Sequence, residues 1–470
     1  MSRAIATLRS LGACVLVLAL GGCATFSKDG GFEAADALAR ERGFAGAKWQ
    51  RSTESEAASQ RDVAEAIAET LTAERAVEIA LRNNQGLQAA FEALSIAEAD
   101  LVQATRLRNP TFSFSRTSGG GHVEIERTVL VNVLAIATMP LAKEFQDRNL
   151  ERAQLDAAAD IVAAGAEARR AYFSAVASNE LVRYQREVKD AADASSELAR
   201  RMVQAGNFSK LAHMREQAFY ADATAQLARA MHQAAVDRER LARALGLASS
   251  TGIRLPDRLP ELPATLAAAP DVERVALERR LDVLSAKRAA EALARSLDLT
   301  RATGVVNVLE AGYTNRSETG EPRANGYEIE LTLPLFDFGD ARTARAQASY
   351  RQAVKRVSDA AIQARSQVRE SYSAYRTTYD LAKHYRDEVV PLRKRISEEN
   401  LLRYNGMLIG VFELLADARE QVGSVTAAIE ALRDFWLAET DLQVSLAGRG
   451  AAGVSARATR APTTAPSADH

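Results

Sequence analysis

The hydrophobic pattern of the chain changes period at a defined point. From Tyr327 to Leu333 apolar and polar side chains alternate, which is typical of a strand with two different faces. After Pro334 and Gly339 the alternation gives way to a run rich in Ala, Arg and Gln, which favours a helix. The pattern therefore predicts a strand that leads almost directly into a long helix.

The same order of elements occurs twice along the chain. Three pairs of segments correspond at nearly the same separation: 76–101 with 272–297, 139–148 with 333–342, and 201–217 with 402–421. The third pair aligns Gly206 with Gly406. An internal duplication explains this agreement better than chance. Each half is predicted to contain a helix, two strands, a long helix, a glycine turn and a returning helix.

The duplication sets the expected boundaries. The first repeat covers 71–250 and the second 271–447, with a proline-rich crossing at 251–270 between them. Strands are expected at 110–118 and 122–137 in the first repeat, and at 305–315 and 326–334 in the second. The last residues, 448–470, are rich in Ala, Thr, Ser and Pro and are expected to form a disordered tail.

The predicted long helices exceed what a compact domain needs. Lys143 to Ala205 contains no proline, and Asp340 to Asn405 contains only Pro391. Some 60 helical residues would reach roughly 90 Å at 1.5 Å per residue. The turns at 206 and 406 would then form the tips of two antiparallel hairpins, far from the strands.

The N-terminus has the features of an export signal. Arg3 and Arg9 precede an apolar stretch from Leu11 to Leu20. The following "LGGC" resembles a bacterial lipobox, which would remove residues 1–22 and acylate Cys23. An ordinary signal peptide with an incidental cysteine is the alternative. With acylation, residues 23–70 would be a lipid-anchored N-terminal extension, held stably by two or more acyl chains.

Composition and charge exclude several functions. The formal net charge of −1 gives no basis for bulk electrostatic binding of nucleic acid. The five histidines are scattered, and neither HExxH nor a phosphate-binding GxxxxGK[ST] loop occurs, so no enzyme activity and no cofactor are expected. His122, Glu124 and Glu126 would share one strand face. Metal capture there is conceivable, but solvated polar residues at a strand end are the favoured interpretation.

Four strands raise a problem of closure. Each is roughly as long as a tilted strand that crosses a bilayer. A sheet in lipid must close, because an open edge leaves unpaired N–H and C=O groups in hydrocarbon, and about eight strands are the practical minimum. Either the strands form soluble hairpins, or several chains share one barrel. Three chains would supply twelve strands.

Several segments resemble the TolC family of outer-membrane efflux proteins, over about Leu71 to Leu446. They are the duplicated helix openings, "LPLFDFGDAR", "RYNG…FELLADAREQ" and "LPDRLPELP". The resemblance implies a mainly α fold with four β-strands per chain. It also implies a homotrimer with a 12-stranded outer-membrane β-barrel that continues as a periplasmic α-helical barrel. The lipobox is similar to that of acylated members that serve resistance–nodulation–division pumps.

The implied function is that of a passive exit duct in a tripartite efflux pump. Its partners would be outer-membrane lipid, a periplasmic adaptor protein and an inner-membrane transporter. A periplasmic adaptor-like lipoprotein and a lipid-anchored helical scaffold are the alternatives, but two hairpins that each follow a strand pair argue against an adaptor. The sequence does not distinguish metal ions from drugs or solvents as cargo.

The resemblance also assigns roles to particular residues. Pro140, Pro334 and Gly339 would mark the membrane-to-periplasm junctions. Glu413 and Asp417 would form a periplasmic gate, although both fit equally well as solvated acids on a helix surface. The expected adaptor-docking residues at the hairpin tips are Gly206, Phe208, Leu211, Gly406, Met407, Leu408 and Val411.

Overall fold

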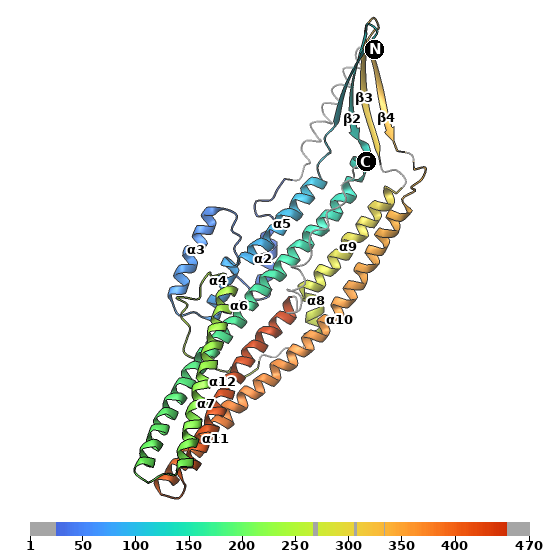
Figure 1. Cartoon of the computed structure of the whole chain (residues 1–470). Coiled ribbons are helices and arrows are strands. Elements are labelled where there is room, and N and C mark those ends of the chain that lie inside the picture. The colour runs from blue at the N-terminus through green and yellow to red at the C-terminus, as the bar shows by residue number, and fades with distance from the viewer. Residues whose placement is uncertain (1–24, 267–270, 305–307, 333, 449–470) are drawn as a thin grey trace. The chain divides into compact units, whose positions relative to one another are not determined.

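The computed structural model describes residues 25–266, 271–304, 308–332 and 334–448. Cys23, the expected signal 1–22 and residues 449–470 of the expected tail lie outside the described residues. In chain order the elements are α2 (Phe32–Arg40), α3 (Thr53–Ala68), α4 (Ala73–Asn83), α5 (Gln85–Ala104), β1 (Thr111–Gly119), β2 (His122–Asn132), α6 (Val133–Gln204), α7 (Lys210–Ala244), α8 (Val272–Arg279), α9 (Leu281–Ala302), β3 (Leu309–Glu318), β4 (Ala324–Leu331), α10 (Asp340–His384), a π-helical turn η1 (Tyr385–Val389), α11 (Val390–Asn405) and α12 (Val411–Ala447) (Figure 1).

The chain divides into two compact units. Unit 1 contains the described residues of 1–35, 91–157 and 282–361, and therefore the strands. Unit 2 contains those of 36–90, 158–281 and 362–470, and therefore the ends of both long hairpins. The mainly helical fold with two strand pairs and two antiparallel hairpins agrees with the prediction.

Within unit 1 the strands form an antiparallel four-stranded sheet in the order β1-β2-β3-β4. Gly120 and Gly121 make the β1–β2 turn with positive φ angles of 62° and 89°, which favour glycine. Among the described residues β1 and β4 each have a neighbour on one side only. The second strand pair extends over 309–318 and 324–331, rather than the expected 305–315 and 326–334, of which 305–307 and 333 lie outside the described residues.

The predicted strand 122–137 is too long, because β2 ends at Asn132 and α6 begins at Val133. The Asn132 side-chain oxygen accepts a hydrogen bond from the Ala135 amide at 2.7 Å, as an N-cap residue does. Pro140 therefore lies inside α6 and not at the strand-to-helix boundary. The apolar run "VLVNVLAIA" is typical of a continuous strand. The asparagine within it caps the first turn of α6, so the residues after it are helical.

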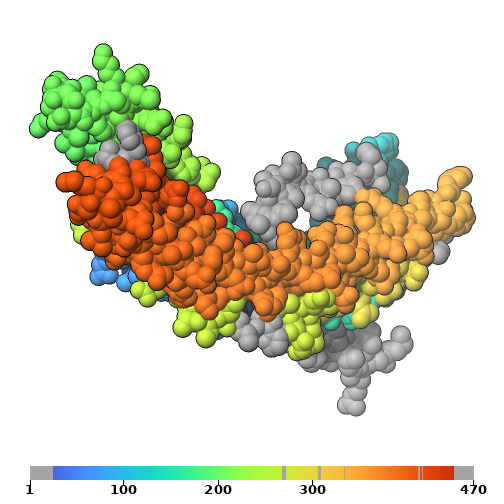
Figure 2. All heavy atoms as spheres, turned by 90° about the horizontal axis from the view of Figure 1, so that it is seen from below, coloured from blue at the N-terminus to red at the C-terminus, as the bar shows by residue number. Residues whose placement is uncertain are grey.

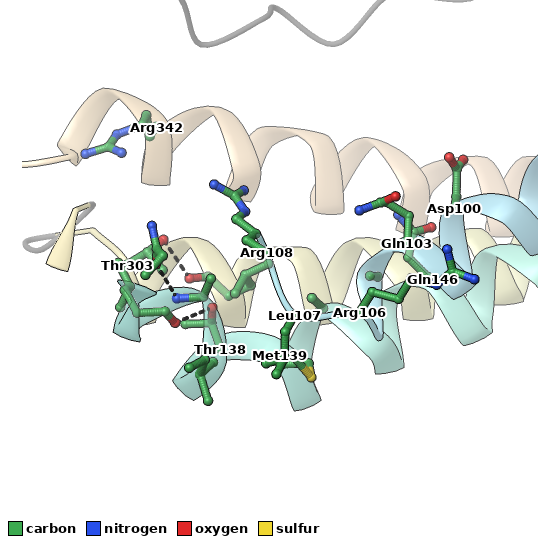
Figure 3. Close-up of a pocket in the computed structure, with 17 residues that line it drawn as sticks. Asp100, Gln103, Arg106, Leu107, Arg108, Thr138, Met139, Gln146, Thr303 and Arg342 are labelled. Atoms are coloured by element: carbon green, nitrogen blue, oxygen red, sulfur yellow. Dashed lines mark hydrogen bonds between the residues drawn. The ribbon is translucent and has the colours of Figure 1, made fainter. Parts of the chain in front are cut away.

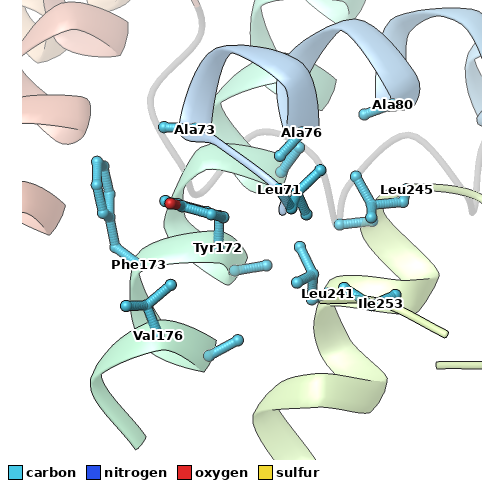
Figure 4. Packing of buried hydrophobic residues seen from close by; sticks show 14 of the residues in the cluster. Leu71, Ala73, Ala76, Ala80, Tyr172, Phe173, Val176, Leu241, Leu245 and Ile253 are labelled. Carbon is cyan, nitrogen blue, oxygen red and sulfur yellow. The ribbon is translucent and has the colours of Figure 1, made fainter. Parts of the chain in front are cut away.

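The main core of unit 2 lies where α4 crosses α6 and α7 (Figure 4). Leu71, Phe173 and Leu241 are buried there. Close packing also explains the glycine in α6, since a Cβ on Gly165 would lie 2.5 Å from Cδ1 of Phe44. The many buried alanines of α6 let neighbouring helices approach closely along this face.

The opening helix of each repeat is interrupted at the same place. Asn84 separates α4 from α5, and Arg280 separates α8 from α9; both have extended backbone. Their amides donate to the carbonyls of Ala80 and Ala276, each at 3.0 Å. The sequence alignment of Ala80 with Ala276 thus corresponds to a shared structural feature, although a single helix was expected in each repeat.

Two further features deviate from uninterrupted secondary structure. The π-helical turn η1 ends two residues before Pro391, which has no amide hydrogen to continue an α-helix. The proline-rich crossing is held by side chains of the helices: the Trp436 indole donates to the Pro260 carbonyl at 3.1 Å, and the Tyr379 hydroxyl donates to that of Ala264 at 3.0 Å. The crossing is therefore fixed to the helices of unit 2.

Candidate functional site

The sheet of unit 1 has one apolar and one polar face. In the observed register, Phe112 pairs with Val129, Val129 with Tyr313, and Tyr313 with Tyr327, so the part of this face nearer the helices is apolar across all four strands. Nearer the turns, the same face carries Arg116, Arg127, Asn315 and Asn325. Its exposed apolar side chains are Phe112, Phe114, Val129, Val131, Tyr313, Tyr327, Ile329 and Leu331. Tyr327 is 92% exposed and Ile329 is 73% exposed. An apolar face this open is stable in water only if something covers it.

The opposite face of the sheet is polar and mostly acidic. Its charged side chains are Glu124, Glu126, Glu310, Arg316, Glu318, Glu328 and Glu330. The Arg316 guanidinium pairs with Glu124 at 2.6 Å. Glu310 lies directly opposite Glu330 in the register, an arrangement of like charges that destabilises a sheet unless water or cations screen it. This face is suited to contact with water.

His122 shares the polar face with Glu124 and Glu126, as the alternation predicts. Among the residues that the structure describes, no group of three or more His, Cys, Asp or Glu side chains could hold a metal ion. Glu124 is instead paired with Arg316. The arrangement therefore gives no support to metal capture at this strand end.

The junction between β4 and α10 has the tight backbone geometry expected where a strand is followed by a helix. Gly339 has a φ of 77°, and a Cβ at this position would lie 2.4 Å from the Gly304 carbonyl oxygen. Its amide donates to the Asp337 carboxylate at 2.8 Å. Pro334 lies between the end of β4 and this turn, whereas Pro140 is inside α6. The two repeats thus make the junction differently.

The connection from β4 to α10 exposes three large apolar side chains, Leu335, Phe336 and Phe338. Phe336 is 98% exposed. These residues follow directly from the apolar face of β4, which ends with Leu331. The apolar surface of the sheet therefore continues into the junction, a continuity that the sequence analysis did not note.

The hairpin ends of unit 2 have equivalent turns, but not at the glycines that the sequence aligned. Gly206 and Met407 both have left-handed backbone, with φ angles of 77° and 61°, whereas Gly406 has a φ of −78°. In each turn, the residue that follows the left-handed position donates its backbone amide to the carbonyl five residues earlier. The Asn207 amide donates to the Met202 carbonyl, and the Leu408 amide donates to the Arg403 carbonyl. Both turns are Schellman motifs, and Gly206 corresponds to Met407.

The tips expose apolar side chains, as predicted. Met407 is 92% exposed and Leu408 is 77% exposed, and Leu211 of the first hairpin is also exposed. Phe208 is half-buried, and the side chain of Val411 lies outside the described residues. Figure 2 shows the end of the α6–α7 hairpin in green beside that of the α11–α12 hairpin in orange-red, in agreement with Figure 1. Together the tips form an apolar surface at one end of unit 2.

The two expected gate residues have different environments. Glu413 is exposed on α12, but Asp417 is only 7% exposed, and its Oδ2 atom has no hydrogen-bond partner. Asp417 is therefore not a solvated acid of the helix surface. A buried carboxylate oxygen without a donor is costly, so it marks a place where the observed packing is less stable than it could be.

A second buried acid occupies the equivalent place in the first hairpin. Glu216 follows Gly206 by the same number of residues as Asp417 follows Met407, and it is 1% exposed. Its carboxylate accepts from the Ser195 hydroxyl at 2.9 Å and lies 3.6 Å from the Arg419 guanidinium of α12. Arg419 also stacks on the Phe219 ring at 4.5 Å. Sequence reasoning did not find this cluster, because the paired segments 201–217 and 402–421 align Glu216 with Glu420 and not with Asp417.

The fold matches those of solved outer-membrane channels. A membrane protein from Pseudomonas aeruginosa superposes with a TM-score of 0.69 at 19% identity, over 80% of this chain and 93% of that one. VceC of Vibrio cholerae gives 0.66 at 15% identity over 80% and 96%. The open state of the MtrE outer membrane channel of Neisseria gonorrhoeae gives 0.66 at 17% identity over 80% and 89%. No protein-family model and no curated protein matches the sequence.

These likenesses confirm the fold that the TolC resemblance implied. The chain has the architecture of outer-membrane channel proteins, with long helical hairpins and a four-stranded antiparallel sheet. In the part of the chain that the structure describes, no helix is long and apolar enough to cross a membrane.

Proposed function

We propose that this protein is the outer-membrane exit duct of a tripartite efflux system. Three copies would combine their sheets into one 12-stranded barrel, with the apolar face toward lipid and the acidic face toward a water-filled bore. The helical hairpins would continue the bore into the periplasm and conduct cargo passively. The observation that carries the proposal is the two-faced sheet with two unpaired edge strands.

The edges and faces support a shared barrel for a physical reason. An open sheet with an exposed apolar face would aggregate in water and would leave unpaired backbone groups in lipid. Joining β4 of one copy to β1 of the next removes both edges. The exposed Leu335, Phe336 and Phe338 would then lie at the membrane surface, where aromatic side chains anchor barrels.

The proposal assigns the remaining sites by position. Acylation of Cys23 would fix the N-terminus to the outer membrane. The apolar tips around Leu211, Met407 and Leu408 would dock a periplasmic adaptor, which in turn contacts an inner-membrane transporter of the resistance–nodulation–division type. Glu413 and Asp417 would act as a gate at the same end.

Two neighbouring residues on β4 provide a matched test of the barrel. Ile329→Lys places a charge on the apolar face, where it should cost about 2–4 kcal/mol in lipid and prevent insertion. Glu330→Lys makes a larger charge change on the polar face, and it should leave trimers inserted. Purified full-length protein would be examined for trimer mass in detergent and for conductance in planar bilayers. Insertion of Ile329→Lys as efficient as that of the unaltered protein would contradict the proposal.

The gate requires its own measurement. Single-channel conductance and block by divalent cations would be compared for Glu413→Ala and Asp417→Ala. Three carboxylates brought close around a pore attract cations, so loss of the gate acid should raise closed-state conductance and weaken the block. If both variants keep the currents and the block of the unaltered channel, the gate lies elsewhere.

A further inference from the structure

A cavity of about 560 Å³ lies in unit 1, where the four helices that adjoin the strands come together (Figure 3). It is separate from the hairpin tips and from the apolar face of the sheet. Its volume is within the range of about 300–1,000 Å³ usual for small-molecule sites. The polar side chains that the argument uses are Asp100, Arg106, Arg108, Asn132, Gln146 and Arg342.

The cavity is positively charged, because three arginines line it against one carboxylate, Asp100. Among the described residues, no carboxylate lies within ion-pair distance of Arg106, Arg108 or Arg342. The three arginine side chains are exposed, so water solvates them, and an anion bound in the cavity would supply the counter-charge that they lack.

The contacts of the three arginines differ. Arg342 donates from Nη2 to the Gly304 carbonyl at 3.3 Å, so part of its role is to hold the end of α9. The Arg106 guanidinium lies 6.0 Å from the centroid of the Phe26 ring. Arg108 makes no hydrogen bond or ion pair with any described residue. In Figure 3 its side chain extends toward α10, the helix that carries Arg342.

The cavity lies on the polar side of the sheet. Asn132 lines it and also donates to the Glu310 carboxylate at 3.4 Å, and Glu310 belongs to the acidic face. The basic cavity therefore adjoins the acidic face, and both would border the bore of the proposed barrel. Anything that leaves the helical part for the strand part of such a bore would meet the arginines first.

We propose that this cavity binds an anionic group, a phosphate or a carboxylate, carried by a small molecule on its way through the bore. Guanidinium groups bind both kinds of anion through paired N–H donors, and neutral polar side chains such as Gln146 can complete the contacts. The role in transport rests on the proposed function. The binding itself does not, because it requires only unit 1 as observed.

The test measures binding directly on purified full-length protein in detergent. Calorimetric titrations with inorganic pyrophosphate and with succinate represent soluble anions. A third titration with short-chain dihexanoylphosphatidylglycerol represents a lipid headgroup. We expect saturable binding with one site per chain, weakened about tenfold or more by Arg108→Gln and by Arg342→Gln, since each removes a charge-assisted hydrogen bond.

Arg345→Gln is the matched control, because it removes the same charge from the same helix, one turn away and outside the cavity. It should change the affinity less than twofold. Binding of pyrophosphate or succinate supports a soluble ligand, and binding of the phosphatidylglycerol alone supports an anionic lipid in the same cavity. No saturable binding of any probe, or equal weakening by Arg345→Gln, would overturn the proposal. Conductance is a separate measurement, so a protein that conducts without binding refutes only this inference.

Discussion

Gly206 and Met407 occupy equivalent turn positions in the two hairpins, and both have left-handed backbone. This conformation costs a residue with a Cβ about 1–2 kcal/mol, whereas glycine adopts it without that cost. The second hairpin thus tolerates a strained methionine that is almost fully exposed. The methionine therefore lowers the stability of this turn, and its exposure suits the docking surface of the proposed function.

The first prediction follows from this pair. Met407→Gly should stabilise the protein by roughly 0.5–1 kcal/mol, and Gly206→Ala should destabilise it by roughly 1–2 kcal/mol. Gly406→Ala is the control, because its φ of −78° and its nearest Cβ contact of 3.5 Å suit alanine. Thermal unfolding in detergent would show the order. A destabilised Met407→Gly would mean that the turn is not strained as described.

A second prediction concerns the β4–α10 junction. Gly339→Ala would place a Cβ 2.4 Å from the Gly304 carbonyl oxygen and force an unfavourable φ, so the free energy of unfolding should fall by about 2–4 kcal/mol. Gly326→Ala, at an open position on β4, should cost less than about 1 kcal/mol. Thermal unfolding and trimer yield would be measured together. Equal effects of the two substitutions would contradict the packing at Gly339.

A third prediction tests the buried acid of the first hairpin. Ser195→Ala removes the donor at 2.9 Å from the Glu216 carboxylate and should destabilise the protein by about 1–3 kcal/mol. Ser196→Ala alters the neighbouring serine and should change stability by less than about 0.5 kcal/mol. A result in which the two alanine variants unfold at the same temperature would remove the Ser195–Glu216 contact from the explanation.

A fourth prediction uses the charge of the polar face. Because glutamates far outnumber Arg316 there, the proposed channel should select cations over anions. The reversal potential in a salt gradient should have the sign of cation selectivity and move toward zero in Glu328→Gln and Glu330→Gln. Anion selectivity in the unaltered channel would show that this face does not line the bore.

A fifth prediction concerns pH. Burial raises the pKa of Glu180, whose carboxylate accepts a hydrogen bond from the Leu259 amide at 3.1 Å. Since the folded protein holds this proton more tightly than the unfolded chain, the stabilising contribution is present at low pH and is lost as pH rises through the raised pKa. Glu180→Gln keeps an acceptor without the charge, so its Tm relative to the unaltered protein should increase with pH.

The measurement is a series of Tm values from pH 4 to pH 8, with the ordinary glutamate pKa of 4.5 at its lower end. Glu187→Gln, an exposed position on the same helix, provides the control. A Tm difference for Glu180→Gln that stays constant over this range would show that burial of Glu180 does not affect stability.

Periodicity and duplication were sufficient to predict the two-faced strands, the long hairpins and the order of elements. The alternation around Ile329 fixes which side chains share a face, and pairing in the sheet adds only the register. The end of β2 could also have been predicted, because Asn132 is a strong N-cap residue. Pro140 is the eighth residue of α6, where a proline is unfavourable, so it gave no sign that the helix continues through this position. The apolar residues on both sides of Asn132 made the whole segment resemble one continuous strand.

The tip geometry and the environment of the gate acids could not be predicted in the same way. Sequence alignment favours glycine on glycine, so it placed Gly206 on Gly406 and missed the left-handed Met407. Whether an acid such as Asp417 is buried depends on how α12 packs against its neighbours. The charge of the cavity near Arg108 likewise depends on which helix ends meet, and these come from both repeats.

The matching interruptions at Asn84 and Arg280 have an evolutionary consequence. They share a hydrogen-bonding pattern although the residues differ, so the bend in the helix was present before the two halves separated. The ancestral gene would then have encoded a half-length product with one hairpin and one strand pair. Six such products, arranged with sixfold rotational symmetry, would have formed the same ring that three copies of the present chain would form in the proposed trimer, with pseudo-sixfold symmetry.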